Sequence, residues 1–336
     1  MTEMPAQPRA ISELVDRMLN GDRVALARLI TLVENRSGPS PVIMSRIYPR
    51  CGRAYIIGIT GPPGAGKSTL TDRLVARARS EERTAAVIAV DPSSPFSGGA
   101  VLGDRIRMQS HFLDPGVFIR SVSSRGSHGG IARSTRDLVR LFDAFGFDLV
   151  IIETVGVGQT ELDVMELADT TVVVLVPEGG DAIQVMKAGL LEIADIFAVN
   201  KADRPGAGRM QTDLEAMLQL RGNKPWVIPV LLTEGTRDGG TDALWQTIGA
   251  HREYREAQEA RSQGGAERRE GELLDILDEE LRRRVRWKLA HPPGDGLAAI
   301  IEAVRSGTVD PYSAALEILG DEGRMAALVE APDASR

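Results

Sequence analysis

The feature that most constrains the fold is a glycine-rich loop between an apolar, β-rich run and a helix-forming segment. The run is Ala54–Thr60, and a helix is expected from Ser68 to about Arg79. Between them the spacing is G-x-x-x-x-G-K-S, formed by Gly61, Pro62, Pro63, Gly64, Ala65, Gly66, Lys67 and Ser68. Such a loop turns successive backbone N–H groups toward an anion, and the helix N-terminus adds a favourable field. The pattern therefore predicts a phosphate-binding loop.

Beyond this loop, short Val- and Ile-rich runs alternate with helix-forming stretches. Helices are expected at Ile131–Phe145 and Leu162–Asp169. The expected strands are Thr84–Val90, Val117–Arg120, Leu149–Glu153, Thr171–Val176, Ile196–Asn200 and Trp226–Leu231. Continuous apolar strands separated by helices are typical of a parallel sheet covered on both faces. The sequence thus predicts an α/β fold with a doubly wound, mostly parallel sheet.

Helical additions are predicted on both sides of a central domain at residues 51–252. Residues 1–50 form an N-terminal helical extension, in which Ile11–Asn35 is broken into two helices at Gly21-Asp22 and Ser37–Pro49, with its prolines, is a connector. Residues 253–336 form a C-terminal helical arm. Within it, Glu253–Lys288 is expected to be one long amphipathic helix or a helical pair. Its apolar stripe, expected to pack on the parent domain, comprises Leu273, Leu274, Ile276, Leu277 and Leu281.

Composition excludes several classes of protein. The net charge is −7 and only 4% of residues are aromatic, which argues against a nucleic-acid partner. A single cysteine, Cys51, cannot form an internal disulfide and favours a reducing, cytoplasmic compartment. The chain contains no apolar run of ~18 residues, so no membrane span is expected.

Oxygen-bearing side chains are expected to complete the phosphate site. Lys67 would place its positive charge beside the β- and γ-phosphates, and Ser68 would ligate Mg²⁺. Thr69 follows them in the first helical turn. Three carboxylates lie at strand ends or in polar loops: Asp91, Asp104 and Glu153. Glu153 is predicted to orient a metal-bound water, and Asp91 and Asp104 to make metal or water contacts in a switch loop. For Asp104 a solvated loop aspartate is the open alternative.

A second glycine motif predicts a nucleotide-sensitive switch. Glu153-Thr154-Val155-Gly156 is similar to the D-x-x-G element of GTPases, with Glu in place of Asp. The Gly156 N–H can meet the γ-phosphate, so loss of that phosphate would release Gly156–Glu161. Gln159 either orients the attacking water or is a surface residue.

The base site is predicted at Asn200-Lys201-Ala202-Asp203, which follows an apolar strand about 130 residues after the phosphate loop. Asp203 can accept both the ring N1–H and the exocyclic amine of guanine, whereas adenine would oppose it with a lone pair. Asn200 would tie this loop to the phosphate loop, and the Lys201 stem would cover the ring. Thr233 and Gly235 belong to the expected remaining base-contacting loop. The predicted nucleotides are therefore GTP and GDP.

Together these motifs resemble the MeaB/ArgK family of GTPases. The most specific parts are Val90–Ser94 with Gly98-Gly99, Leu102–Arg105, Glu153–Gln159, and Asp181 with Gln184, Lys187 and Gly189. The resemblance implies a GTP-hydrolysing chaperone of adenosylcobalamin-dependent acyl-CoA mutases, chiefly methylmalonyl-CoA mutase, that gates cofactor loading and protects the mutase. It also implies a homodimer with the C-terminal arm at the subunit contact, magnesium-site acids at Asp91, Asp104 and Glu153, and three mobile switch segments. Pro177–Gly189 matches the third of these, although Glu178 replaces a glycine common there.

Three other functions stay open at this point. One is a metallochaperone GTPase for nickel enzymes, which usually carries clustered metal-delivery residues, whereas the histidines here are scattered at His111, His128, His251 and His291. Another is a kinase for a transport protein, and the third is a binding module whose nucleotide is purely structural.

Overall fold

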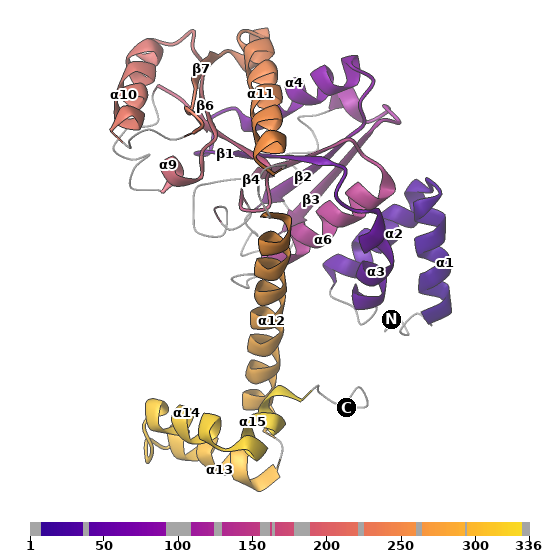
Figure 1. Cartoon of the computed structure of the whole chain (residues 1–336), viewed down its shortest axis with the longest axis vertical. Helices are drawn as coiled ribbons and strands as arrows, with labels where there is room; N and C mark the ends of the chain where they lie inside the picture. Colours follow the sequence, from indigo (N-terminus) through magenta and orange to yellow (C-terminus); the bar gives the residue numbers. More distant parts are fainter. Residues whose placement is uncertain are drawn as a thin grey trace. The chain divides into compact units, whose positions relative to one another are not determined.

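The computed structural model describes residues 8–35, 40–91, 109–123, 130–154, 162, 165–177, 189–220, 225–259, 264–292 and 294–330. The chain divides into two compact units, Met1–Ala257 and Gln258–Arg336. The N-terminal helices and the central sheet therefore belong to one compact unit, and Figure 1 labels most of its helices and strands.

A seven-stranded sheet is the centre of the first unit. Its strands are β1 (Tyr55–Thr60), β2 (Ala85–Asp91), β3 (Val117–Ser123), β4 (Leu149–Thr154), β5 (Thr170–Leu175), β6 (Ile196–Asn200) and β7 (Val230–Thr233). Their order is β3-β2-β4-β1-β5-β6-β7, and every neighbouring pair is parallel. The prediction of an α/β fold with a doubly wound sheet is confirmed, and the described strands are entirely parallel.

Helices cover both faces of the sheet because successive strand residues point to opposite sides. Val87 and Ile151 pack with α4 (Lys67–Ser80) and α11 (Thr241–Glu259). Their chain neighbours Ile88 and Ile152 pack with α6 (Gly130–Phe145). Further helices, α9 (Leu190–Ile193) and α10 (Ala207–Gln219), pack on Val173 and Leu175. This two-sided burial explains why the strands are continuously apolar.

The prediction for the last strand was wrong in position. Strand pairing begins at Val230 rather than Trp226 and extends to Thr233. Trp226 instead packs its ring on His251, and its indole N–H donates to the backbone oxygen of Asp195 at 2.9 Å. Trp226 therefore lies in an irregular segment before β7, although its β propensity favoured a place in the strand.

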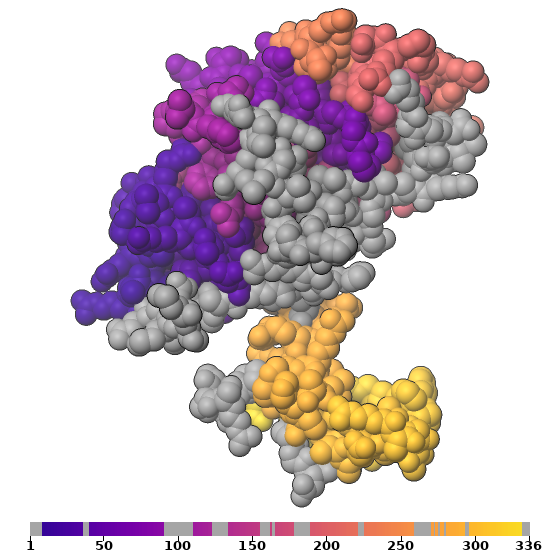
Figure 2. Space-filling view, turned by 180° about the vertical axis from the view of Figure 1, so that it is seen from behind, coloured from indigo at the N-terminus to yellow at the C-terminus, as the bar shows by residue number. Residues whose placement is uncertain are grey.

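The N-terminal segment folds as a helical bundle against α6. The predicted break at Gly21-Asp22 is confirmed: α1 (Pro8–Leu19) ends before it, and Asp22 caps α2 (Arg23–Glu34) by accepting from Val24 N and Ala25 N. The bundle also reaches β3, because Arg120 donates to Glu34, and Figure 2 shows the indigo helices beside the magenta segment around this strand.

The expected connector at Ser37–Pro49 was wrong for its described part. It contains α3 (Ser40–Ile47) and the short 3₁₀ helix η1 (Tyr48–Arg50). Pro41 lies in the first turn of α3, where its missing N–H costs no helical hydrogen bond. Ile43 and Ile47, one turn apart, are fully buried, so burial outweighs the prolines.

The second unit is entirely helical in its described residues. It contains α12 (Gly264–Ala290), α13 (Gly294–Arg305), α14 (Pro311–Gly320) and α15 (Glu322–Val329). Its small core comprises Leu297, Ile300, Ile301, Ala314, Ile318 and Leu328. The helical pair anticipated as one alternative for Glu253–Lys288 is observed, because Glu253 lies in α11 and Lys288 in α12.

Leucines of the apolar stripe of α12 are exposed, with fractions of 56% at Leu273, 66% at Leu274 and 48% at Leu277. None of the described helices is both long and apolar enough to cross a membrane.

Candidate nucleotide-binding site

Three predicted elements meet at the carboxyl edge of the sheet. The glycine loop follows β1, Glu153 lies near the end of β4 beside it, and Asn200 is the last residue of β6. In open parallel sheets this edge is where ligands bind, because the loops leaving the strands converge there.

Close backbone approach explains the glycines of the loop. At Gly61 φ is +143°, and a Cβ would lie 2.0 Å from the Val174 backbone oxygen on β5. At Gly66 φ is +89°, and a Cβ would lie 2.3 Å from Asn200 Nδ2. Only glycine fits both positions. The loop is thereby drawn against β5 on one side and the base loop on the other.

Lys67 begins α4 and folds back over the loop that precedes it. Its side chain is buried, and Nζ donates to the backbone oxygens of Gly61 at 2.8 Å and Pro62 at 2.9 Å. The ammonium group is thus held beside the backbone that would surround a phosphate.

Glu153 is joined directly to the start of α4. Its carboxylate is 2% exposed and accepts from Ser68 Oγ at 2.5 Å and from Thr71 Oγ1 at 3.1 Å. Carboxylate and hydroxyl oxygens are the ligands that Mg²⁺ prefers. The residues present therefore fit the magnesium ion predicted from the sequence.

Asn200 connects the phosphate loop with the base loop. Its Nδ2 donates to the Ala65 backbone oxygen at 2.8 Å. Its Oδ1 accepts from Thr233 Oγ1 at 3.3 Å and from Gly235 N at 3.1 Å. One buried amide thus fixes three loop segments relative to one another.

The residues after Asn200 turn sharply toward solvent. Lys201 has φ of +58°, and Ala202 N donates to the Thr233 backbone oxygen at 3.0 Å. Asp203 is exposed, as a carboxylate that accepts from an incoming base requires. Thr233 is the last residue of β7, not part of a loop after it, and its buried hydroxyl supports Asn200. Gly235 opens the 3₁₀ helix η3 (Gly235–Arg237).

Several predicted residues lie outside the described part of the chain. The backbone of Asp91 ends β2, opposite Ser123, but its side chain is not described. Asp104, Gly156 and Gln159 fall outside the described residues, as does Pro177–Gly189 apart from its two ends.

Sequence reasoning missed two contributors on α4. Thr71 donates to Glu153 and lies three residues after Ser68, so helical spacing alone could have placed it on the same face. Arg73 contacts the loop at Gly235, and no local signal in the sequence indicates that contact.

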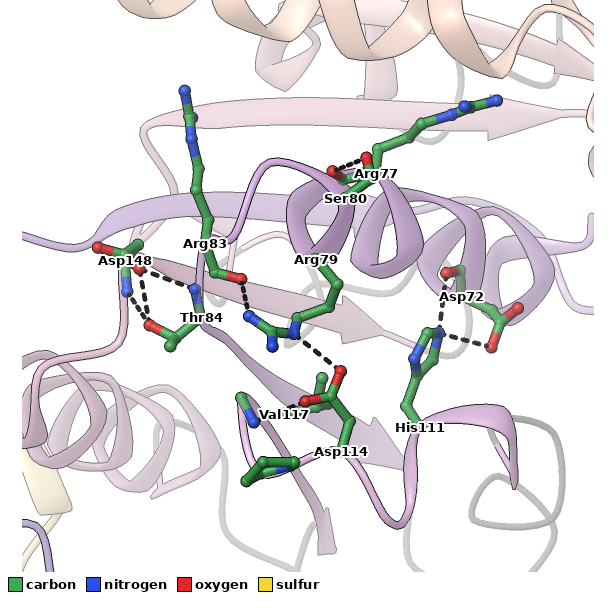
Figure 3. A network of polar contacts seen from close by, with 12 residues as sticks. Asp72, Arg77, Arg79, Ser80, Arg83, Thr84, His111, Asp114, Val117 and Asp148 are labelled. Carbon is green, nitrogen blue, oxygen red and sulfur yellow. Dashed lines mark hydrogen bonds and ion pairs between the residues drawn. The ribbon is translucent and has the colours of Figure 1, made fainter.

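A polar network also anchors α4 to the segment before β3, as Figure 3 shows. His111, in the 3₁₀ helix η2 (Gln109–His111), places Nε2 3.3 Å from Asp72 Oδ1, and Ser110 donates to the same oxygen. The hydrogen bond between the His111 and Asp72 side chains raises the pKa of His111 and lowers the pKa of Asp72. Arg79 likewise donates to Asp114 at 2.8 Å. The chain that returns from the predicted switch residues is therefore fixed to the phosphate-loop helix.

Among the described residues, no group of three or more His, Cys, Asp or Glu side chains could hold a metal ion. His251 is buried against Thr170, and burial lowers its pKa. Burial raises the pKa of the Cys51 thiol to about 11, so it stays protonated at neutral pH.

Comparison with known proteins decides the family. A family model described as "Methylmalonyl Co-A mutase-associated GTPase MeaB" matches residues 26–290. The chain belongs to the MeaB family of GTPases. It is therefore a P-loop GTP hydrolase, and the resemblance drawn from its motifs is confirmed.

Individual MeaB-family relatives agree with this assignment. A putative GTPase from Pyrococcus abyssi is 49% identical over 313 residues, 92% of this chain and 96% of the relative. A protein from Cupriavidus metallidurans named fused isobutyryl-CoA mutase is 39% identical over 245 residues, 70% of this chain but 22% of that protein. A crystal structure titled LAO/AO transport system kinase aligns with a TM-score of 0.62 at 28% identity, covering 94% of this chain and 98% of that one.

Proposed function

We propose that this protein is a GTP-driven chaperone of an adenosylcobalamin-dependent acyl-CoA mutase, with methylmalonyl-CoA mutase as the first candidate. The observation that carries the proposal is the relative from Cupriavidus metallidurans, in which a homologous segment is part of a protein named as a mutase. The description of the matching family also names methylmalonyl-CoA mutase. Segments fused in one chain commonly act on one another.

The reaction is GTP + H₂O → GDP + phosphate. Lys67 and the loop amides of Gly61–Ser68 stabilise the charge of the transferring phosphoryl group, because preorganised donors need no reorganisation during reaction. Glu153 orients a water through its buried carboxylate, and Asn200 and Asp203 select guanine.

Magnesium is part of the proposal. Ser68, Asp91, Asp104 and Glu153 would hold it, with Asp91 and Asp104 assigned from the sequence alone. When bound, the ion would neutralise charge on the β- and γ-phosphates. Gly156 is proposed to sense the γ-phosphate, Gln159 to orient the attacking water, and Pro177–Gly189 to signal to the mutase.

Partner stimulation is the decisive test. No arginine finger is identifiable from the sequence, so the free protein should hydrolyse GTP slowly and a partner should complete the site. Phosphate release is measured with Mg·GTP while purified methylmalonyl-CoA mutase is titrated, with Lys67→Ala as the inactive control. A rate that rises and saturates with mutase supports the proposal. A rate that stays constant over a broad range of mutase concentration contradicts it.

A capture experiment identifies the client. Native partners are recovered with the protein in the presence of GDP or of a non-hydrolysable GTP analogue. Recovery of an acyl-CoA mutase that depends on the nucleotide is expected, whereas recovery of a transport protein that becomes labelled from γ-labelled GTP would favour the kinase function instead.

A further inference from the structure

One face of α4 contacts the segment that follows β7, at Gly235, Thr236 and Asp238. Thr69, Arg73 and Arg77 are spaced four residues apart, so they lie in one row along the helix. A Cβ at Gly235 would lie 3.2 Å from Thr69 Cγ2, so loop and helix are already in contact there. The helix that begins with the phosphate-binding residues thus also supports the segment that follows β7.

Arg73 donates two hydrogen bonds to the backbone of the segment that follows β7. Its Nε donates to the Gly235 backbone oxygen at 3.0 Å, and its second terminal nitrogen donates to the Thr236 backbone oxygen at 3.3 Å. The guanidinium is a rigid fork, so two carbonyls bound to it are fixed in direction. The described backbone has no cis peptide, so the Thr236 N–H points away from Arg73 in the same peptide plane.

The same loop is held on its other side by the base motif. Gly235 N donates to Asn200 Oδ1, and Asn200 in turn binds the phosphate loop. Further along, Arg77 pairs with Asp238 at 2.6 Å and Asp242 at 3.1 Å. The segment bound by Arg73 is therefore also held by Asn200 at Gly235, and the Arg77–Asp242 ion pair fixes the start of α11.

Directed backbone N–H groups can distinguish the two purines. Guanine presents an acceptor at O6, where adenine presents an amine that only donates. An N–H that points into the base site can donate to guanine O6 but faces another donor on adenine. It therefore favours guanine, provided that its direction is fixed.

We propose that Arg73 is a positioning residue for guanine selectivity, acting through the carbonyls of Gly235 and Thr236. This inference rests on the proposed guanine site at Asn200–Asp203. It assigns selectivity in part to a side chain on the phosphate-loop helix, which itself does not touch the base.

The test compares GDP with ADP. Both nucleotides, ADP up to millimolar concentration, displace a fluorescent GDP analogue from wild-type protein, Arg73→Ala, Arg73→Lys and Arg79→Ala. Arg73→Ala should lose about tenfold in GDP affinity, with ADP affinity unchanged, so that the selectivity ratio falls. Arg73→Lys keeps the charge but not the fork and should lie between. Arg79→Ala is the matched control, because Arg79 donates to Asp114 and Arg83 instead of the loop.

Each outcome decides between roles. An unchanged GDP affinity, or an equal loss for GDP and ADP, overturns the positioning role, since general damage to α4 would weaken both nucleotides. If Arg73→Ala does not fold, the ratio in Arg73→Lys carries the test with a smaller drop expected. Wild-type protein without any preference for GDP would overturn the proposed guanine site and this inference together.

Discussion

At the residue scale, Glu153 is a buried carboxylate on β4 that is hydrogen-bonded to α4. It lies on a central strand, is almost fully buried, and receives hydrogen bonds from two hydroxyls of α4. A buried carboxylate needs such donors because its charge is costly without them. Its place beside Ser68 also brings it next to the predicted metal, so we propose that one side chain serves both the fold and the reaction.

Replacing Glu153 by glutamine tests that chemical role. Glu153→Gln keeps the size of the side chain but removes the negative charge, so hydrolysis at saturating Mg·GTP should fall about 100-fold or more. Phosphate release measures the rate, and the circular dichroism spectrum checks the fold. Glu215→Gln, on the exposed surface of α10, is the control and should match wild type. A Glu153→Gln protein with more than about a tenth of the wild-type rate would exclude this role.

At the element scale, α4 connects the phosphate loop, the base loop and the segment before β3. Its N-terminus carries Lys67 and Ser68, one row of its side chains holds the loop at Gly235, and Asp72 binds His111. An element with contacts of this kind on several sides transmits displacement, because packed helices move as rigid bodies.

The Asp72–His111 pair should make stability depend on pH. The pKa of His111 is raised above 6.5 in the folded state, so its contribution is complete below pH 6.5 and is lost as the pH rises through the raised pKa. The pKa of Asp72 is lowered below 3.8, so its contribution is lost only as the pH falls through that lowered value. The pair therefore stabilises most between these limits.

His111→Gln isolates this effect, because glutamine keeps a donor but does not titrate. Wild type should exceed the variant by about 1 kcal/mol in unfolding free energy at about pH 5.5, and by progressively less as the pH rises through the raised pKa of His111. Urea unfolding at a series of pH values measures the difference. His291→Gln, at an exposed position, is the control for the loss of an imidazole. A constant difference for His111→Gln would show that the pair is not charged.

At the scale of the whole molecule, the chain forms two units with different surfaces. The first buries a sheet between helices, whereas the second exposes leucines along α12. Exposed apolar patches can mark interaction sites. We propose that these leucines of α12 lie at the contact of the homodimer that the family resemblance implies.

Charged substitutions on α12 test the homodimer. Leu274→Asp with Leu277→Asp should convert a dimer to monomer, because two unpaired carboxylates would be buried at the contact. Light scattering coupled to size-exclusion chromatography measures the mass. Leu220→Asp, at an exposed leucine of the first unit, should leave the mass unchanged. A monomeric wild type, or a doubly substituted protein of unchanged mass, would contradict the proposal.

The sequence by itself determined the fold class, the phosphate loop and the position of the base motif. These features depend on short spacings within the chain: a glycine pattern between strand and helix at Gly61–Ser68, and the four residues at Asn200–Asp203 that begin at the end of a strand. Local backbone geometry follows from such spacings, so it can be read without knowledge of distant residues.

Only the tertiary structure decided which distant residues support the site and where some elements begin. Arg73 meets Gly235 across 162 positions, Trp226 leaves the strand to pack on His251, and Ser40–Ile47 is helical because Ile43 and Ile47 are buried. In each case the deciding free energy comes from a contact with a residue far away in sequence, which outweighs the weak local propensity. Local patterns thus indicate which residue types form the site, and long-range packing fixes where those residues lie.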